Sequence, residues 1–409
     1  MRIDYEFKDK VDLYVLIPTI ILVLIGLISI YSSTFNNSTA ENNFQRQFLF
    51  VLAAFMISMI IYFLPTNSFK FSSIPLYFLG IILLIAVLVV GKTVSGSKSW
   101  LAFGPIGFQP SEFMKIATIL MLSYYLSRNN ADIDSIKDIF VALLIGFIPV
   151  FLILLEPDMG TSIIFFFMIL TILFYKGLSL LWIVVVISPA CVALSAIFGT
   201  LPFIVSLVLC LTIIFLLSKD LFFTGSVIGI NIAAGFLADF VFNILSPHQQ
   251  DRIRSFIDPT SDPLKTGYNS IQAMVAVGSG GLFGKGFMKG NQTQLQYIPE
   301  QWTDFIFCTI GEEFGFVGSM FVIILFLILM HRILSNASST KDEFLRLVQI
   351  GIFSVIFIHF FINVGMVIGL VPVIGVPLPF VSYGGSSLIA NVIMISIVLN
   401  IYRSRKNFA

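Results

Sequence analysis

The sequence is poor in charge: only 11% of its 409 residues are Asp, Glu, Lys or Arg, whereas 57% are hydrophobic. A soluble domain carries about 25% charged residues. So few charges would not keep a globule of this length in solution, but they suit a chain that lies mostly in lipid. The formal net charge is only +1 and no basic face is visible, so we expect no nucleic-acid partner.

Cysteine and histidine are also scarce, with three of each. The cysteines lie in or just inside apolar runs without metal-like spacing, which is typical of small buried side chains. The histidines are scattered, at His248, His331 and His359. No Ser-His-Asp set, zinc signature or nucleotide fingerprint appears. The residues therefore predict no metal ligands and no tightly bound cofactor.

Long apolar runs dominate the rest of the chain, and a membrane span needs about 20 such residues. The candidate spans lie near residues 13–33, 47–64, 74–91, 111–127, 138–155, 160–176, 179–198, 201–217, 222–245, 305–331, 346–370 and 384–402. The pair near 201–245 is the least secure, because one of its two runs could be re-entrant. We therefore expect an all-α, polytopic transmembrane bundle of about 10–12 spans, forming a single membrane domain over residues 1–409.

The Lys and Arg residues predict the orientation. With the N-terminus inside, the short outer loops hold only Arg46, Lys92 and Lys98, and the inner side holds most of the remaining cations. The positive-inside rule then places both termini in the cytoplasm. A long connection, residues 246–304, falls on the outer side. It contains apolar pieces such as GYNSIQAMVAVGSGG, so we expect an ordered, functional extracytoplasmic loop.

Two opposite charges lie at membrane depth in the stretch GFQPSEFMK. Glu112 and Lys115 are three residues apart, on one face of a helix that starts at Pro110 or Ser111. A charge at that depth costs about 2.5–3.5 kcal/mol. The two residues form either a structural ion pair or part of a polar cavity. Lys98, in the Gly-rich loop before them, is a candidate ligand for phosphate or lipid head groups, or an interfacial anchor.

A further carboxylate, Asp304, lies where the long loop re-enters the membrane in PEQWTDFIFCTIGEEFG. Partial desolvation beside Trp302 would suit it to act as a general base, and the alternative is an Asp that caps the next helix. Glu312 and Glu313 follow, and one of them is a candidate partner for Lys115.

Three other places carry charge. LLEPDMGTS reads as a tight outer turn or as a helix cap by Asp158 and Thr161. Arg252 is either a phosphate clamp or an exposed charge. Lys285 lies in GSGGLFGKG, which lacks the spacing of a nucleotide-binding loop. From these residues alone, an enzyme and a transporter remain open.

The motifs together resemble the SEDS family (shape, elongation, division and sporulation). The matching stretches are FQPSEFMKIA, EPDMGTS, DPTSDPLKTGYNSIQAMVAVGSGGLFGKGFMKGNQTQLQYIPEQWTDFIF, GEEFGFVG and NVGMVIGLVPVIGVPLPFVSYGGSS. Their variants look like the elongation, rod-shape branch rather than the division branch. The chain departs from the family's usual ten spans by about 40 additional residues, assigned to the hydrophobic pair at 201–245. Trp302 stands where relatives often carry His, which puts in doubt a proton relay through that neighbour.

The resemblance implies a peptidoglycan glycosyltransferase that polymerises lipid II at the outer face of the bacterial cytoplasmic membrane. The family's catalytic Asp corresponds to Asp304, which would deprotonate the attacking hydroxyl. The candidate substrate-binding residues are Lys98, Glu112, Lys115, Arg252 and Lys285, since cations must meet the charge of a pyrophosphate leaving group. The resemblance also implies a class B penicillin-binding protein (a transpeptidase) as partner, contact with membrane lipids, and a divalent cation, Mg or Mn.

Two other functions compete with the enzyme. A lipid II flippase often shows repeat symmetry between its halves, and the sequence shows none. A non-catalytic scaffold for a transpeptidase has no need of a carboxylate at position 304.

Overall fold

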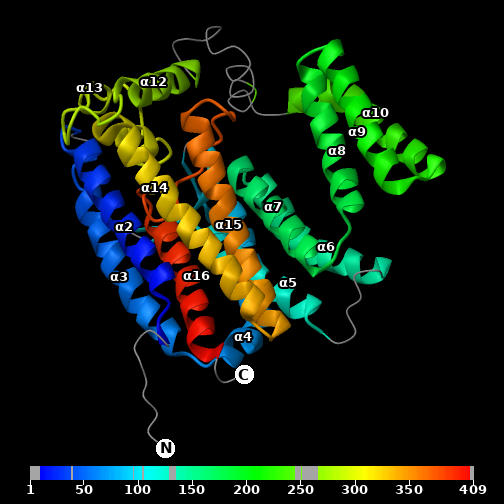
Figure 1. Cartoon of the computed structure of the whole chain (residues 1–409), viewed down its shortest axis with the longest axis horizontal. Coiled ribbons are helices and arrows are strands. Elements are labelled where there is room, and N and C mark those ends of the chain that lie inside the picture. The colour runs from blue at the N-terminus through cyan, green and yellow to red at the C-terminus, as the bar shows by residue number, and fades with distance from the viewer. Residues whose placement is uncertain are drawn as a thin grey trace, which may run out of the picture. The chain divides into compact units, whose positions relative to one another are not determined.

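The computed structural model describes residues 10–37, 40–94, 96–103, 106–128, 135–244, 250 and 266–405. The chain forms two compact units, one of Met1–Ile172 with Tyr268–Ala409 and the other of Leu173–Gly267. Both consist mainly of long helices (Figure 1).

The helices of the first unit form a bundle. They are α2 (Leu13–Thr34), α3 (Asn43–Phe63), α4 (Thr66–Val90), α5 (Pro110–Leu126), α6 (Ile136–Leu155), α14 (Ile306–Ser339), α15 (Glu343–Val367) and α16 (Gly385–Ser404), with α7 (Met159–Lys176) leading into the second unit. Figure 1 shows α14 and α15 running side by side, and α14 also packs against α2. α5 packs against α4, α6 and α15, and α16 packs against α3. α15 and α16 are buried along most of their length, which places the core of this unit around them.

Within the described residues, eleven helices are long and apolar enough to cross a membrane. α5, with 17 residues, is slightly shorter. A helix of that length still measures about 26 Å, close to the roughly 30 Å of a hydrocarbon core. With α5, the structure has one helix for each of the predicted spans, so the prediction of a polytopic helical bundle is confirmed.

The second unit contains α8 (Leu180–Ile197), α9 (Thr200–Ser218) and α10 (Leu221–Ile244). α8 packs against both of the others. Asn231 of α10 donates a hydrogen bond to Ser188 Oγ of α8 at 3.1 Å, which links these two helices. The least secure predicted pair, 201–217 and 222–245, thus corresponds to two full-length helices, and the structure does not support a re-entrant segment there.

A small antiparallel sheet joins α4 to α5, which the sequence reading did not predict. Its strands are β1 (Lys92–Val94), β2 (Ser97–Phe103) and β3 (Ile106–Phe108), in the order β1-β2-β3. The backbone N–H of Lys98 also bonds to the carbonyl oxygen of Glu156, at 3.1 Å. The sheet is therefore anchored to the turn between α6 and α7.

The described part of the predicted 246–304 loop contains two helices, α12 (Thr266–Ser279) and α13 (Asn291–Gln294). The carboxylate of Glu312, on α14, anchors this segment. It accepts hydrogen bonds from Lys285 Nζ at 2.8 Å and from the backbone N–H groups of Gln292 and Thr293, each at 2.9 Å. Glu313 accepts from Ser32 of α2 and from Gln294. The expectation that Glu312 or Glu313 pairs with Lys115 is therefore wrong, because both carboxylates turn towards the segment before α14.

The two ends of the first unit are held by different contacts. At one end, Tyr62 of α3 donates to the carbonyl of Lys10, and Asn400 of α16 donates to the carbonyl of Leu64. At the other end, Gln47 of α3 donates to the carbonyl of Ser382, before α16. The start of α2 and the end of α16 consequently lie at the same end of the bundle.

Candidate functional site

A buried charged cluster lies where α5 meets α15. The Lys115 ammonium is 2.9 Å from Glu112 Oε2 and 2.9 Å from Nε2 of His359. The contact with Glu112 is an ion pair without directed hydrogen-bond geometry. All three side chains are buried. The predicted pairing of Glu112 with Lys115 is confirmed: Pro110 is the first residue of α5, and the helical period puts both side chains on one face.

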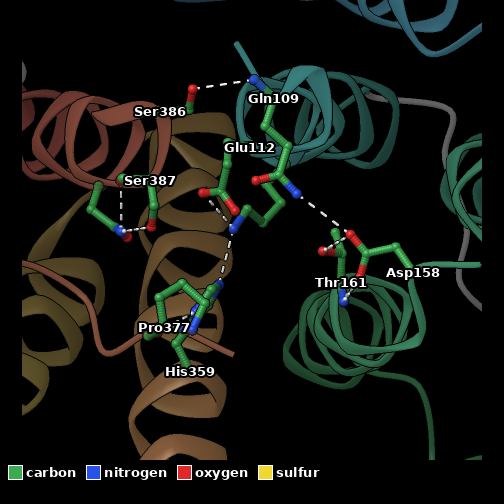
Figure 2. Close-up of polar contacts among 10 residues, drawn as sticks. Gln109, Glu112, Asp158, Thr161, His359, Pro377, Ser386 and Ser387 are labelled. Carbon is green, nitrogen blue, oxygen red and sulfur yellow. Dashed lines mark hydrogen bonds and ion pairs between the residues drawn. The ribbon is translucent and has the colours of Figure 1, made fainter. Parts of the chain in front are cut away.

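Asp158 lies beside this cluster, as Figure 2 shows for the polar groups around Gln109 and Glu112. It accepts hydrogen bonds from the backbone N–H of Thr161 at 3.0 Å and from Thr161 Oγ1 at 2.8 Å, so the predicted cap at the start of α7 is confirmed. Gln109 Nε2 lies 3.4 Å from Asp158 Oδ2. Burial raises the pKa of Asp158, and the hydrogen bonds from Thr161 lower it. Two smaller effects follow: the charge of Glu112 raises this pKa and the charge of Lys115 lowers it.

Asp304 occupies the last turn before α14 and is half-buried. The N-cap position of α14 is Phe305, the residue that follows Asp304. The backbone on both sides of Asp304 is held by the segment before α16. Ser382 Oγ donates to the carbonyl of Thr303 at 2.6 Å, and the Tyr383 N–H donates to the carbonyl of Trp302 at 2.9 Å. The Asp304 carbonyl accepts a hydrogen bond from Asn363 at 2.8 Å.

The other predicted binding cations have structural partners or lie outside the described residues. Lys98 Nζ donates to the carbonyls of Leu88 and Val89, at 2.7 and 3.0 Å, and so caps the last turn of α4. Lys285 pairs with Glu312 at 2.8 Å. Arg252 lies outside the described residues. Of the predicted set, the structure brings Glu112 and Lys115 together, and it gives Lys98 and Lys285 places in other contacts.

A divalent cation has no protein cage in the part of the chain that the structure describes, where no three His, Cys, Asp or Glu side chains come together. Mg²⁺ commonly binds through one or two carboxylates together with phosphates and water. The carboxylates of the buried cluster are Glu112 and, beside it, Asp158.

The sequence reading missed two polar residues of α15, His359 and Asn363. Both are buried, at 1% and 0% exposure, inside a helix that is otherwise largely apolar. Their spacing of four residues puts them on one face, and this was the available signal. His359 does not fit a pattern of metal ligands, because its partner is a lysine that lies 244 residues away in the chain.

The fold and the cluster define a multi-pass membrane protein with a buried polar site between its helices. The chain belongs to the FtsW/RodA/SpoVE family, described as cell cycle protein, which matches residues 12–206 and 186–407. This confirms the resemblance to the SEDS family.

Relatives that align over nearly the whole chain support the same family assignment. Peptidoglycan glycosyltransferase MrdB of Escherichia coli K12 is 34% identical over 403 residues, covering 98% of this chain and 96% of the relative. Peptidoglycan glycosyltransferase RodA of Treponema pallidum is 32% identical over 425 residues, covering 95% and 97%. Stage V sporulation protein E of Bacillus subtilis is 34% identical over 407 residues, covering 97% and 98%.

Solved structures show the same fold. One chain, from a peptidoglycan synthase complex described as coordinating polymerization and crosslinking, aligns with a TM-score of 0.73 at 25% identity, covering 99% of both chains. The rod-shape-determining protein RodA of Thermus thermophilus aligns with a TM-score of 0.64 at 23% identity, covering 97% of both chains.

Proposed function

We propose that this chain is a peptidoglycan glycosyltransferase that polymerises lipid II during cell elongation. The observation that carries the proposal is the 34% identity to a peptidoglycan glycosyltransferase over 98% of the chain. The chain is an enzyme rather than a scaffold in this proposal, because it keeps a half-buried carboxylate, Asp304, on a turn that three separate hydrogen bonds hold in place. Preorganised polar groups of this kind are what catalysis requires.

In the proposed reaction, the 4-hydroxyl of an acceptor GlcNAc attacks the anomeric carbon of the donor MurNAc. Asp304 takes the proton of the attacking hydroxyl, the new glycosidic bond forms with inversion, and undecaprenyl pyrophosphate leaves. A general base must lie within hydrogen-bond reach of the proton it removes. The turn before α14 suits this role because its backbone is tied to the segment before α16.

Lys115 is the cation that we assign to the negative charge of the leaving group, with Glu112 as its partner. Lys115 is 0% exposed, and Glu112 and His359 lie 2.9 Å from its ammonium, so it has the polar partners that a lysine inside a membrane bundle requires. Substrate roles for Lys98, Lys285 and Arg252 remain predictions. A divalent cation on the pyrophosphate would share the charge, with Asp158 the nearest additional carboxylate.

We place the site on the outer face of the membrane and both termini in the cytoplasm. Arg332 and Arg403 bond to groups at the end of the first unit where α2 begins and α16 ends. Ser32, Glu313 and the turn that holds Asp304 lie at the opposite end. Since cytoplasmic loops are richer in Lys and Arg, the end with the arginines faces inwards and Asp304 faces outwards.

The proposed partner is a class B penicillin-binding protein, which would crosslink the strands that this chain makes. The support is the likeness to a chain of a peptidoglycan synthase complex that coordinates polymerization and crosslinking. The transpeptidase would act on the glycan strands that this chain makes, so association would shorten the distance that a strand travels between the two active sites.

The test is polymerisation of labelled lipid II by the purified full-length chain, with and without its transpeptidase. We expect wild type to make long glycan strands and Asp304→Asn, which keeps the shape but not the charge, to lose at least about 100-fold in rate. Glu300→Gln, an exposed carboxylate in the same turn, is the matched control and should keep its rate. Equal rates for wild type and Asp304→Asn would refute the site. An inert wild type that moves lipid II across vesicle bilayers would replace the enzyme by a flippase.

A further inference from the structure

His359 and Asn363 lie one turn apart on α15 and face the two halves of the proposed site. Buried polar side chains are costly inside a membrane helix and usually turn towards other polar groups of the bundle. Both residues are at most 1% exposed. Leu or Phe would fill either position of this apolar helix without that cost, so each polar group calls for a specific partner.

The partners of His359 define its protonation. Its Nδ1 lies 3.1 Å from the carbonyl oxygen of Pro377. A carbonyl oxygen only accepts hydrogen bonds, so Nδ1 carries the proton and donates. Nε2 then has a lone pair, and it lies 2.9 Å from the Lys115 ammonium, which only donates. The imidazole thus acts as a neutral acceptor for Lys115, between α5 and the segment that follows α15, as Figure 2 shows for His359, Pro377 and Glu112.

Asn363 makes the corresponding contact with the Asp304 turn. Its Nδ2 donates to the carbonyl of Asp304 and to the carbonyl of Val376, both at 2.8 Å. Val376 and Pro377 are consecutive residues. The two side chains of α15 therefore bind adjacent carbonyls of one segment. The other contact of His359 is the Lys115 ammonium, and the other contact of Asn363 is the backbone carbonyl of Asp304.

We propose that His359 and Asn363 are positioning residues, which fix Lys115 and Asp304 relative to each other through the Val376–Pro377 segment. The inference rests on the proposed function, in which Asp304 removes a proton while Lys115 meets the developing charge of the leaving group. Those two events occur at opposite sides of one reacting carbon, so the distance between the groups matters. A misplacement of about 1 Å can cost about 100-fold in rate.

Two amide variants of His359 separate positioning from packing. In His359→Gln we expect the longer amide to put its oxygen where Nε2 lies, so that it keeps the contact with Lys115 and weakens the bond to Pro377. In His359→Asn the shorter amide keeps the bond to Pro377 and loses Lys115. Ser354→Ala is the matched control, since Ser354 is buried on the same helix and its Oγ donates to the carbonyl of Gly351 in the preceding turn, at 2.7 Å.

The measurements are kcat and KM for lipid II polymerisation, and Tm in detergent, on the full-length chain with its transpeptidase. We expect His359→Asn to lower kcat about tenfold or more with little change in KM, and His359→Gln to recover most of that loss. Ser354→Ala should match wild type. If His359→Asn does not fold, His359→Phe replaces it, and Asn363→Leu tests the Asp304 contact with the same expected loss of kcat.

Equal kcat for the Asn and Gln variants, or losses of activity that simply follow Tm, would overturn the inference. Its failure is distinct from that of the proposed function. An active wild type, an inactive Asp304→Asn and a fully active His359→Asn would reject only the positioning roles. A wild type that does not polymerise lipid II would reject both.

Discussion

Asp12, at the start of α2, accepts a hydrogen bond from Nε of Arg332, near the end of α14, at 2.7 Å. Asn336 Nδ2 donates to the same Oδ2, also at 2.7 Å. The guanidinium lies over the rings of Tyr14 and Tyr402 as well, so α2, α14 and α16 meet around one arginine. This contact marks the end of the bundle opposite to Asp304, and it gives the predicted orientation a structural landmark.

The first prediction concerns that orientation. Glu300 and Lys341 are both exposed, and they lie at the two ends of α14. In a background where the exposed Cys191 is replaced by Ser, a membrane-impermeant maleimide should label Glu300→Cys in intact spheroplasts and Lys341→Cys only after permeabilisation. The reverse labelling pattern would mean the opposite membrane topology, with Asp304 on the cytoplasmic side. It would contradict a polymerisation site on the outer face.

The second prediction concerns Lys285, a candidate for substrate binding that the structure pairs with Glu312. Removing a hydrogen bond to a charged group costs about 1–3 kcal/mol. We therefore expect Lys285→Met to lower Tm and to speed proteolysis of the segment before α14, with KM for lipid II nearly unchanged. Lys289→Met, a nearby exposed lysine, is the control and should leave Tm unchanged. A tenfold rise in KM for Lys285→Met at unchanged Tm would instead support the substrate role.

The third prediction concerns Lys98, whose ammonium caps the end of α4. A cation at a helix C-terminus contributes about 0.3–1 kcal/mol. Lys98→Met should thus lower Tm slightly and leave the polymerisation rate within about twofold of wild type, whereas Lys98→Arg should restore Tm. The exposed Lys92, on the neighbouring strand, supplies the control variant Lys92→Met. The alternative is that Lys98 binds the substrate. A large loss of polymerisation rate in Lys98→Met, without a loss of Tm, would support that alternative.

The parts of this molecule that could be predicted from sequence are those set by local rules. Each span follows from the length of an apolar run, and Glu112 meets Lys115 because a helix brings residues three apart together. Glu312 illustrates what local rules cannot reach. Its partners Lys285 and Thr293 lie 27 and 19 residues earlier, and the choice among such distant partners depends on how the segment before α14 folds back.

The same limit applies to the site. Asp304 and Lys115 were candidates on sequence grounds, but the residue that binds Lys115 from α15 was not, since a histidine in an apolar run carries no sign of its partner. The small sheet before α5 was missed for a different reason. Its strands are short, and the stretch that contains them, GKTVSGSKSWLAFGPIGF, is interrupted by glycines in a way that also describes an irregular loop.

The last prediction concerns Glu156, in the turn between α6 and α7. Its side chain is fully buried, and among the residues that the structure describes neither carboxyl oxygen has a hydrogen-bond partner. Burial, and secondarily the nearby Asp158, raise the pKa of Glu156 from 4.5 to about 8. The folded protein therefore keeps this proton at pH values where the unfolded chain has already lost it.

The sign of the effect follows from proton linkage: stability falls as pH rises from about 4.5 to about 8, and is flat above that range. Glu156→Gln removes the titrating group, so we expect the Tm of the variant minus that of wild type to increase from pH 5 to pH 8 and then to level off. Glu41→Gln, at an exposed carboxylate, should give a difference that does not vary with pH. If the Glu156→Gln difference is also constant over this range, then Glu156 is ionised in the folded protein, and a partner or water must compensate its charge.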